Sequence, residues 1–328
     1  MTFIQRAAVV AGLALSVFAW HGSVQAQQTM RIAIVTPKDS HYGQAIDHFA
    51  QVVADRTEGR YKIETFYSSS LGGEREIVEA VQMGTQELSL TGTSVTSNFV
   101  PTVRVLDLPY LFRDYGHARG VLDSDIGEDL LESYKDYGFQ ALGWAENGFR
   151  HMTTSSKAIE TPDDLKGLKL RTMETPIHIR AYREFGVLPT PMSFSELFTA
   201  LQQGVVDGQE NPLSVITTSK LYEVQEHLAL TGHVYTAGVF LMNKDIFDSL
   251  SDEDKEIFTE AAREATVVAR NRVDADEVGS VEVLRNAGMQ IVEDIDKAAF
   301  RAKLDALYAD MEKEFGADVF ARISSFGQ

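Results

Sequence analysis

The spacing of apolar residues alternates between the period of a strand and the period of a helix. Residues 30–35 (MRIAIV) alternate like a strand, and residues 61–67 (YKIETFY) are rich in aromatic and β-branched residues, which favour strands. Between them, residues 45–53 carry apolar side chains three or four positions apart, as an amphipathic helix does. This alternation continues along the chain, and it predicts an α/β fold with mainly parallel strand pairing.

One helix-like segment occurs twice. Residues 76–87 (EIVEAVQMGTQE) resemble residues 196–207 (ELFTALQQGVVD), with Glu, Ala, Gln and Gly at equivalent places. Each copy predicts a helix that ends at a glycine and is followed by a strand. So short a match is open to chance. The other interpretation is two lobes built on one plan, whose helix N-termini face a shared cleft and favour anions.

The segment after Ser251 predicts an unusually long helix. Ser251 and Asp254 have the spacing of a capping box, and the pattern ends at residues 286–288 (NAG). If it is continuous, the helix has about 36 residues and is about 54 Å long. That exceeds one small lobe, so the helix is expected to span two. The alternative is two helices broken near Gly279.

The chain predicts two α/β lobes around a ligand cleft, joined by short crossings. Two glycine-bearing segments between strand-like runs are the candidates, residues 146–148 (ENG) and 235–238 (YTAG). They divide the chain into lobe 1, residues 27–148 plus 237–279, and lobe 2, residues 149–236 plus 280–328. The length of 328 residues also favours two lobes of about 150 residues over one core.

The first 26 residues read as a secretory signal peptide. Arg6 is followed by an apolar run over residues 7–20 and then by small residues at 24–26 (VQA). An uncleaved anchor is the alternative, but the run is shorter than the roughly 20 residues that a membrane span needs. We therefore expect residues 1–26 to be removed and the mature chain to be soluble and exported to the periplasm.

Charge and composition narrow the class of partner. The net charge is −18, and the loss of Arg6 makes it one unit more negative. Such a charge repels nucleic acid and anionic membrane, so neither is expected as a partner, and an anion site must be locally basic. The chain has no cysteine, which excludes disulfides and thiol chemistry.

Motifs of the common enzyme classes are absent. The sequence has no Walker-type loop, no G-x-S-x-G and no H-E-x-x-H. The pair Gly72-Gly73 lacks a following Lys-Ser/Thr, which favours a turn over a phosphate cradle. His41 and His48 could share a helix face, but no carboxylate accompanies them at metal spacing. We therefore expect a protein that is not an enzyme, with no metal and no cofactor.

Polar residues stand at the ends of predicted strands. Arg150 follows the first crossing, Arg171 ends the run LKLR, and residues 209–212 (QENP) follow the strand-like GVVDG. Strand ends line the ligand crevice of a doubly wound lobe, where a guanidinium matches a carboxylate. The alternative for each arginine is an internal salt bridge. For Asn211 the alternative is a turn before Pro212.

Three segments resemble the DctP-type solute-binding proteins of tripartite ATP-independent periplasmic (TRAP) transporters. They are LGGEREIVEAVQMGTQEL, GFRHMTTSSKAIETPDDLKGLKLRTM and PTPMSFSELFTALQQGVVDGQENPL, and the resemblance covers essentially the whole mature chain. It implies a periplasmic-binding-protein-like α/β fold, a small carboxylate ligand, and delivery without ATP to a permease with one small and one large membrane subunit. We expect a monomer.

The resemblance also implies the ligand-binding residues. It places the carboxylate-clamping arginine at Arg171, a second ligand arginine at Arg150, an aromatic floor at Phe194 and an asparagine at Asn211. Four further expected ligand-binding positions are Glu74, Gly92, Glu174 and Glu210.

Two features bear on which acid is bound. The sialate-binding branch of the family carries an acid where this chain has Gly92, which argues against sialate. The polar residues Glu174, His178 and Glu210 favour a hydroxylated acid, such as a hydroxy or dicarboxylic acid or a sugar acid. Two other functions remain open at this point: a ligand sensor for a receptor kinase, and an exported enzyme acting on a sugar acid.

Overall fold

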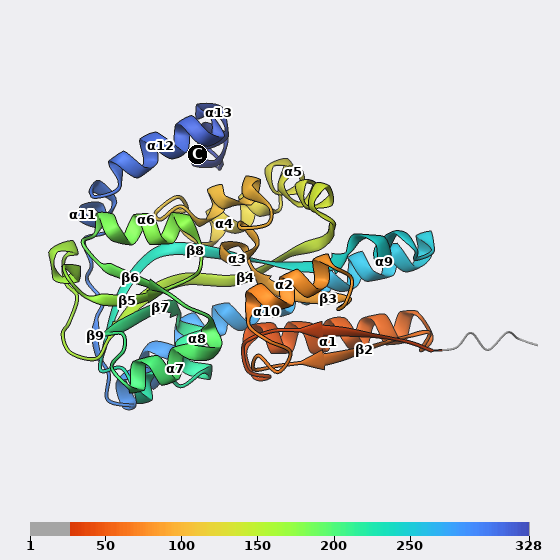
Figure 1. The fold of residues 1–328 in the computed structure, drawn as a ribbon, viewed down its shortest axis with the longest axis horizontal. Helices are drawn as coiled ribbons and strands as arrows, with labels where there is room; N and C mark the ends of the chain where they lie inside the picture. The colour runs from red at the N-terminus through yellow and green to blue at the C-terminus, as the bar shows by residue number, and fades with distance from the viewer. Residues whose placement is uncertain (1–26, 328) are drawn as a thin grey trace, which may run out of the picture.

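The structure, a computed structural model, describes residues 27–327. The predicted signal peptide, residues 1–26, lies outside the described residues. The fold is mixed α/β, as expected, and two α/β units share one nine-stranded sheet with the strand order β2-β1-β3-β8-β4-β7-β5-β6, in which β9 pairs with β8 (Figure 1).

The first unit, red to orange in Figure 1, contains the first three strands. It consists of β1 (Gln28–Ala33), α1 (His41–Arg56), β2 (Tyr61–Phe66), α2 (Glu74–Gln82) and β3 (Leu88–Gly92). Strand β1 pairs in parallel with both β2 and β3. This pairing agrees with the parallel arrangement that the alternating pattern predicts.

The second unit, green in Figure 1, repeats this plan. It consists of β5 (Lys169–Thr172), α6 (Pro176–Glu184), β6 (Leu188–Pro191), α7 (Phe194–Gln202) and β7 (Gly208–Pro212). Strand β5 pairs in parallel with β6 and β7, so each unit has its first strand in the middle. The two copies of the repeated segment form the equivalent helices α2 and α7. The repeat therefore reflects two units built alike.

Two long antiparallel strands, β4 (Phe139–Thr154) and β8 (His227–Asn243), run through both units and join them. The two predicted crossings lie side by side in these strands, where Glu146 pairs with Ala237 and Gly148 with Thr236. A register shift, as in a β-bulge, falls between Glu146 and Gly148. Gly148 has a φ of 112°, which residues other than glycine rarely adopt. The crossing is thus a two-stranded ribbon with a local irregularity.

A buried polar cluster ties this ribbon to its surroundings. Glu146 is fully buried and accepts hydrogen bonds from the Tyr235 hydroxyl at 2.8 Å and from Arg119 Nε at 3.0 Å. Arg119 also donates to Asp274 at 2.6 Å. These contacts connect both crossing strands to α4 (Tyr115–Leu122) and to the long helix α10 (Asp252–Asn286).

Helix α10 is continuous over 35 residues, so the alternative of a break near Gly279 is wrong. The Ser251 side chain accepts a hydrogen bond from the backbone N–H of Asp254, as its spacing predicts. The helix packs against α1 of the first unit, against β4, and against α8 (Leu213–Thr218), which follows β7. It therefore spans both units.

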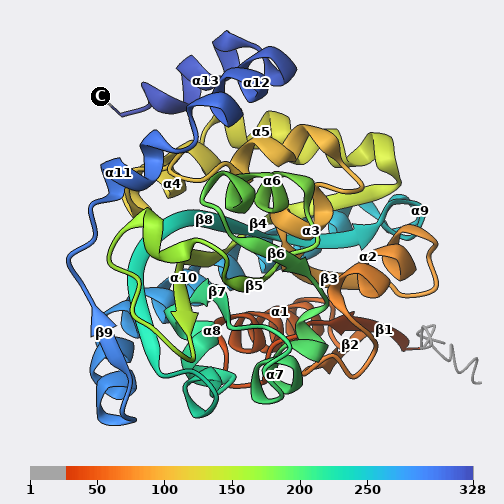
Figure 2. The same ribbon diagram turned by 60° about the vertical axis from the view of Figure 1, so that its left-hand side comes forward.

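The remaining elements are short helices and one edge strand. They are α3 (Thr93–Thr96), η1 (Pro101–Asp107), α5 (Asp125–Glu132), η2 (Ser133–Tyr137), η3 (Pro162–Leu165), η4 (Leu221–Glu223), α9 (Lys244–Asp248), β9 (Gln290–Val292), α11 (Lys297–Ala302), α12 (Asp305–Phe315) and α13 (Ala317–Ser324). The last three helices lie outside α4, α5 and α6 (Figure 2). Arg104 and Glu314 form an ion pair at 2.8 Å, which links α12 to η1.

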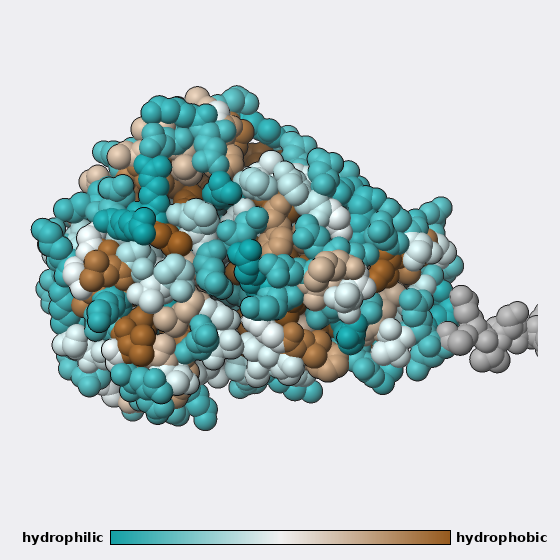
Figure 3. Space-filling view, viewed as in Figure 1, coloured by the Kyte–Doolittle hydropathy of each residue, from teal (hydrophilic) through white to brown (hydrophobic). Residues whose placement is uncertain are grey.

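The cores lie on the sheet faces. One cluster of buried residues joins β1, β3, α1 and α10, around Phe49, Phe240 and Phe258. A larger cluster covers elements of both units, and a third lies beneath α7 and α8. On the face viewed in Figure 3, hydrophobic residues form small separate patches. Within residues 27–327, no helix is both long enough and apolar enough to cross a membrane.

Candidate ligand-binding site

The N-termini of the two equivalent helices meet. Helix α2 begins after Gly73 and α7 begins after Ser193. A Cβ atom placed on Gly73 would lie only 2.5 Å from Ser193 Oγ, so the two units touch at this point. The expectation that both helices start at a shared cleft is confirmed. The free N–H groups of both helices make this region favourable for an anion.

Two small cavities, of about 20 Å³ and 10 Å³, lie beside this contact. The larger is lined by Thr36, Tyr42, Glu74, Asn147, Arg150 and Asn211, among others. The smaller is lined by Arg171, Glu174, Met192 and Ser193, among others. Glu74, Met173 and Phe194 line both, so the cavities adjoin. The expected residues Arg150, Arg171, Asn211, Phe194, Glu74 and Glu174 therefore all border one site between the units.

Arg150 is fully buried in β4 and is already paired. Its Nη2 lies 3.0 Å from Glu210 Oε1, and its Nε bonds to Oε2 of the same carboxylate. Nη2 also contacts the Asn211 side-chain oxygen at 3.2 Å. Of the three guanidinium nitrogens of Arg150, only Nη1 has no hydrogen-bond partner within residues 27–327. The salt-bridge alternative therefore holds for Arg150, since Glu210 neutralises its buried charge.

The position of Glu210 corrects a second expectation. Residues 209–212 (QENP) were expected to follow a strand, but they lie within β7 itself, and residues 204–207 form the turn before it. Strand β7 pairs with β4 in the register Met152–Glu210 and Arg150–Pro212. This register brings the buried Glu210 carboxylate to Arg150. Glu210 therefore neutralises an arginine and is absent from the lining of either cavity.

The charge state of this pair follows from its neighbours. Burial alone would raise the pKa of Glu210, but Arg150 and His233 outweigh burial and hold that pKa far below its usual range. His233 Nε2 lies 3.5 Å from Glu210 Oε2 and 3.0 Å from the Tyr182 hydroxyl. The Arg150 pKa is raised, because the attraction of Glu210 exceeds the penalty of burial. Both groups are thus ionised at neutral pH.

Arg171 has a different environment. It is 1 % exposed, and its Nε donates to the Met192 carbonyl at 3.1 Å. Its guanidinium carbon lies 6.0 Å from the centre of the Phe194 ring. Over residues 27–327 it forms no ion pair. Burial lowers the pKa of Arg171 to about 10, although nearby acids oppose the shift. It is therefore a buried cation without a counter-anion in contact.

Glu74 is one of two acidic residues that line the cavities, the other being Glu174. Glu74 is the first residue of α2, and its Oε1 accepts a hydrogen bond from Thr91 Oγ1 at 3.2 Å. Burial raises the pKa of Glu74. The positive charge of Arg171 acts in the opposite direction and is the second largest influence on this pKa. Its side chain borders both cavities. Glu74 thus places an acceptor beside the unpaired arginine.

Gly92 lies next to the site without lining it. It ends β3 and pairs with Gly238. A Cβ at Gly92 would lie 3.1 Å from Thr236, a residue of the crossing strand β8. The lack of a side chain there allows close packing against the crossing.

Tyr42 and Asn147 were missed by the sequence reasoning. Tyr42 belongs to α1, and its buried hydroxyl has no hydrogen-bond partner within the described chain. Asn147 lies at the irregularity of β4, and its side-chain oxygen contacts His41 Nε2 at 3.1 Å. A bulge often re-aims a side chain near a site, so the asparagine beside a crossing glycine was the available signal for Asn147. Tyr42 carried none.

The two histidines that were considered for a metal site, His41 and His48, each have a side-chain partner. His41 contacts Asn147, and His48 Nε2 lies 3.5 Å from Glu264 on the surface. Burial lowers the pKa of His41 to about 3, so it is neutral. In the part of the chain that the structure describes, no group of three or more His, Cys, Asp or Glu side chains is placed to hold a metal ion.

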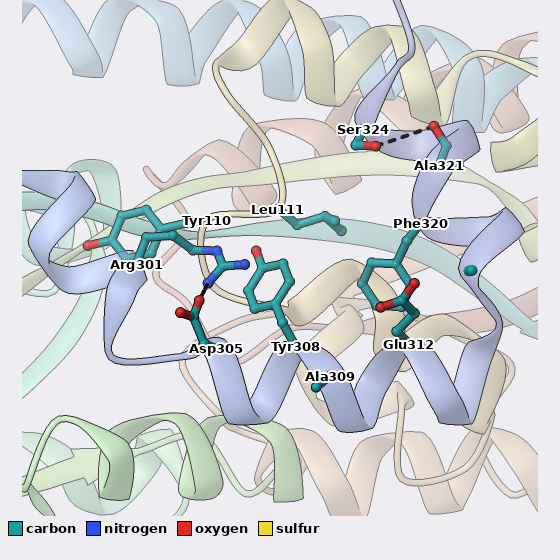
Figure 4. A pocket seen from close by; sticks show the side chains of 11 residues that line it. Tyr110, Leu111, Arg301, Asp305, Tyr308, Ala309, Glu312, Phe320, Ala321 and Ser324 are labelled. Atoms are coloured by element: carbon teal, nitrogen blue, oxygen red, sulfur yellow. Dashed lines mark hydrogen bonds and ion pairs between the residues drawn. The ribbon is translucent and has the colours of Figure 1, made fainter.

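A larger cavity of about 610 Å³ lies elsewhere, between the loop at Tyr110 and helices α12 and α13 (Figure 4). Arg301 is the one arginine or lysine among its lining residues, and it is paired with Asp305 at 2.8 Å. Glu312 adds a further negative charge. Arg301 is therefore already neutralised, and the smaller cavities at Arg171 form the better anion site.

Comparison with known proteins agrees with this fold. Residues 32–314 match the family model of DctP, the bacterial extracellular solute-binding protein family 7. A solute-binding protein of Verminephrobacter eiseniae is 55% identical over 92% of this chain and 90% of its own length. The chain belongs to the DctP family of bacterial extracellular solute-binding proteins.

Two solved structures are close to this one. A TRAP periplasmic solute-binding protein from Polaromonas, bound to D-erythronate, has 50% identity and a TM-score of 0.91, covering 92% of this chain and 100% of the other. A second, from Bordetella bronchiseptica with density interpreted as pantoate, has 45% identity and a TM-score of 0.90, with the same coverage.

Proposed function

We propose that this protein is a periplasmic receptor that captures a small organic acid bearing hydroxyl groups and delivers it to a TRAP-type membrane permease. The observation that carries the proposal is Arg171, a buried guanidinium between two α/β units that has no counter-anion in contact among residues 27–327. A buried charge without a partner is costly, and a ligand carboxylate removes that cost. The two relatives of known structure are bound to, or interpreted with, small hydroxylated acids.

In the proposed complex the ligand carboxylate lies on Arg171. A guanidinium offers two parallel donors to a carboxylate, and each charge-assisted hydrogen bond contributes roughly 1.5–3 kcal/mol. Arg150 supplies Nη1, its one nitrogen without a partner among residues 27–327, from the adjoining cavity. Asn211 contacts Arg150 through its oxygen and Gln209 through its nitrogen, so it chiefly positions Arg150. Phe194 covers the site as an apolar wall.

Ligand capture is proposed to close the two lobes. The hinge is the pair of crossings at residues 146–148 and 235–238, and the lobes are residues 27–148 plus 237–279 and residues 149–236 plus 280–328. The two adjoining cavities have walls from both units, with Glu74 and Tyr42 on one side and Arg150 and Arg171 on the other. A ligand that contacts both sides favours the closed arrangement.

The closed, loaded protein would then be recognised by a permease with one small and one large membrane subunit. We propose that the receptor acts as a monomer in the periplasm after removal of residues 1–26. We also propose that it performs no catalysis. The residues that line the two cavities include no serine or threonine hydroxyl hydrogen-bonded to a histidine, the pairing that acyl transfer requires.

A binding screen tests the proposal. Ligand-free protein is titrated calorimetrically, and its melting temperature followed, with D-erythronate, pantoate, D-galactonate, succinate and, as the neutral control, D-galactose. A ligand at a hundredfold excess over its Kd stabilises the folded protein by about 2.7 kcal/mol, which a melting curve detects. At least one acid is expected to bind and D-galactose is not. Binding of D-galactose with no response to any acid would overturn the proposal.

A further inference from the structure

The arginines of the site require a carboxylate on the ligand, and Glu74 restricts what the rest of the ligand can be. We infer that Glu74 selects hydroxylated monocarboxylates and rejects dicarboxylates, because it places a negative charge where the body of an acid bound to Arg171 must lie. This inference rests on the proposed function, since it assumes that a ligand carboxylate meets Arg171. It concerns what the remainder of the ligand has to be.

The position of Glu74 follows from the two cavities. Arg171 lines the smaller cavity, and Arg150 with Asn147 and Tyr42 lines the larger. Glu74 lines both, together with Met173 and Phe194. A molecule that extends from Arg171 into the larger cavity therefore passes the Glu74 carboxylate.

The charges of the site define what that carboxylate accepts. Arg150 and Glu210 neutralise each other through direct contacts. Arg171, Glu74 and Glu174 remain, and with both acids ionised they sum to one negative charge. A dicarboxylate therefore brings one more negative charge into this group than a monocarboxylate does. In a poorly solvated site the second negative charge is costly, and most costly when it lies against a fixed carboxylate.

The hydrogen-bonding inventory leads to the same ligand. An ionised carboxylate only accepts hydrogen bonds, and Thr91 supplies one donor, to Oε1 of Glu74. A ligand hydroxyl is a second donor, and its oxygen in turn accepts from the unpartnered Arg150 Nη1 or Tyr42 hydroxyl in the larger cavity. Methylene groups leave Arg150 Nη1 and the Tyr42 hydroxyl without partners and add no donor to Glu74 beside Thr91. A hydroxyl therefore satisfies the site where a hydrocarbon chain does not.

The test compares ligands of one chain length with two matched variants. Calorimetry measures Kd for D-erythronate, butyrate and succinate with the wild type, with Glu74→Gln and with Glu79→Gln. Glutamine keeps the shape of Glu74 and removes the charge. Glu79 lies on the same helix, pairs with Arg75 at 3.0 Å on the surface and lines neither cavity, so its variant is the control for charge alone.

The wild type is expected to bind D-erythronate at least a hundredfold more tightly than butyrate or succinate. Glu74→Gln is expected to weaken D-erythronate about tenfold and to strengthen succinate, because neutral hydrogen bonds are weaker and the repulsion is gone. Glu79→Gln should leave the affinity for D-erythronate relative to butyrate, and relative to succinate, as it is in the wild type. An unchanged ratio of erythronate to succinate in Glu74→Gln, or tighter binding of succinate by the wild type, overturns the inference. If no acid binds the wild type, the proposed function itself fails.

Discussion

The two buried arginines of the site lie in the same sheet and differ in what neutralises them. Arg150 in β4 contacts the Glu210 carboxylate through two nitrogens, and both side chains are fully buried. Arg171 in β5 has a backbone carbonyl, a methionine sulfur and an aromatic ring around it. The first is an internal ion pair, and the second is a charge for which we propose a ligand carboxylate as the partner.

The difference assigns separate roles to two residues that look alike in the sequence. A buried pair contributes to stability mainly because breaking it leaves an uncompensated charge. An unpaired buried charge costs stability until a ligand arrives, so its removal affects binding and not folding. The same contrast exists among the acids. Glu210 has an arginine in contact, whereas Asp107 is fully buried with only the hydroxyls of Thr93 and Ser94.

The largest effect is expected for ligand binding in Arg171→Met. Two charge-assisted hydrogen bonds are lost, at roughly 1.5–3 kcal/mol each, so affinity should fall by more than a hundredfold. The melting temperature of the ligand-free protein should be unchanged or higher, because an unpaired buried charge is removed. Calorimetric titration and thermal unfolding measure the two quantities.

Arg171→Lys is the sharper version of this test. Lysine keeps the charge without the planar fork, and affinity should fall about tenfold to a few hundredfold. Arg285→Met, at an exposed arginine paired with Glu293, serves as the control for the loss of one charge. Near-wild-type affinity of Arg171→Lys with unchanged melting would show that Arg171 has a structural role.

For Arg150 the expected effect is on folding. Arg150→Met leaves Glu210 as a buried unpaired carboxylate and should lower the free energy of unfolding by about 3–5 kcal/mol. The double variant Arg150→Met with Glu210→Met removes both charges and should recover most of that loss. Denaturant unfolding of the single and double variants measures the coupling. If the stability loss of the double variant equals the sum of the losses of the two single variants, the pairing of Arg150 with Glu210 is contradicted.

Because Asp107 is buried, we expect the free energy of unfolding to depend on pH. Burial raises its pKa to about 7, so its folded-state pKa is above the unfolded value. The stability that the protonated acid contributes is present below about pH 4 and is lost as the pH rises through 7. Asp107→Asn should therefore gain stability over the wild type from pH 5 to pH 8, by about 2–4 kcal/mol. Melting of both proteins across this range measures the gain, and a constant difference would contradict the assignment.

The smallest expected effect is at the crossing beside Arg150. Gly148→Ala forces a side chain into a left-handed backbone and toward the Tyr115 hydroxyl, 3.0 Å from the new Cβ. Such strain costs about 1–3 kcal/mol. Gly279→Ala, in α10 with no atom within 4 Å, should instead stabilise the protein by about 0.5–1 kcal/mol. Equal melting shifts of the two variants would mean that Gly148 is under no special constraint.

Much of the fold could be predicted from local patterns. The capping spacing at Ser251 and the unbroken helical period gave α10, and the repeated glycine-ended segment gave α2 and α7. Gly148 was recognised in the sequence as part of the first crossing. Its positive φ explains why a glycine stands there. These features depend on residues within one or two turns of each other, so they can be read without the tertiary structure.

The candidate site could be predicted only in part. Arg150, Arg171, Asn211, Phe194, Glu174 and Glu74 all border the cavities, because residues at strand ends and helix starts converge in a sheet of this kind. Glu210 was also expected to contact the ligand, but it pairs with Arg150 and lines neither cavity. Tyr42 was missed because an aromatic residue at the start of an amphipathic helix has the same pattern whether it packs in a core or borders a cleft.

The sequence by itself determined the kinds of elements, their order, and the presence of two guanidinium groups near one cleft. The tertiary structure decided which guanidinium is satisfied. Arg150 and Glu210 are 60 residues apart, and they meet only because β7 pairs with β4 in one register. Local propensity acts over a few neighbouring residues, whereas the neutralisation of a buried charge depends on which side chains lie within a few ångströms in a medium of low dielectric.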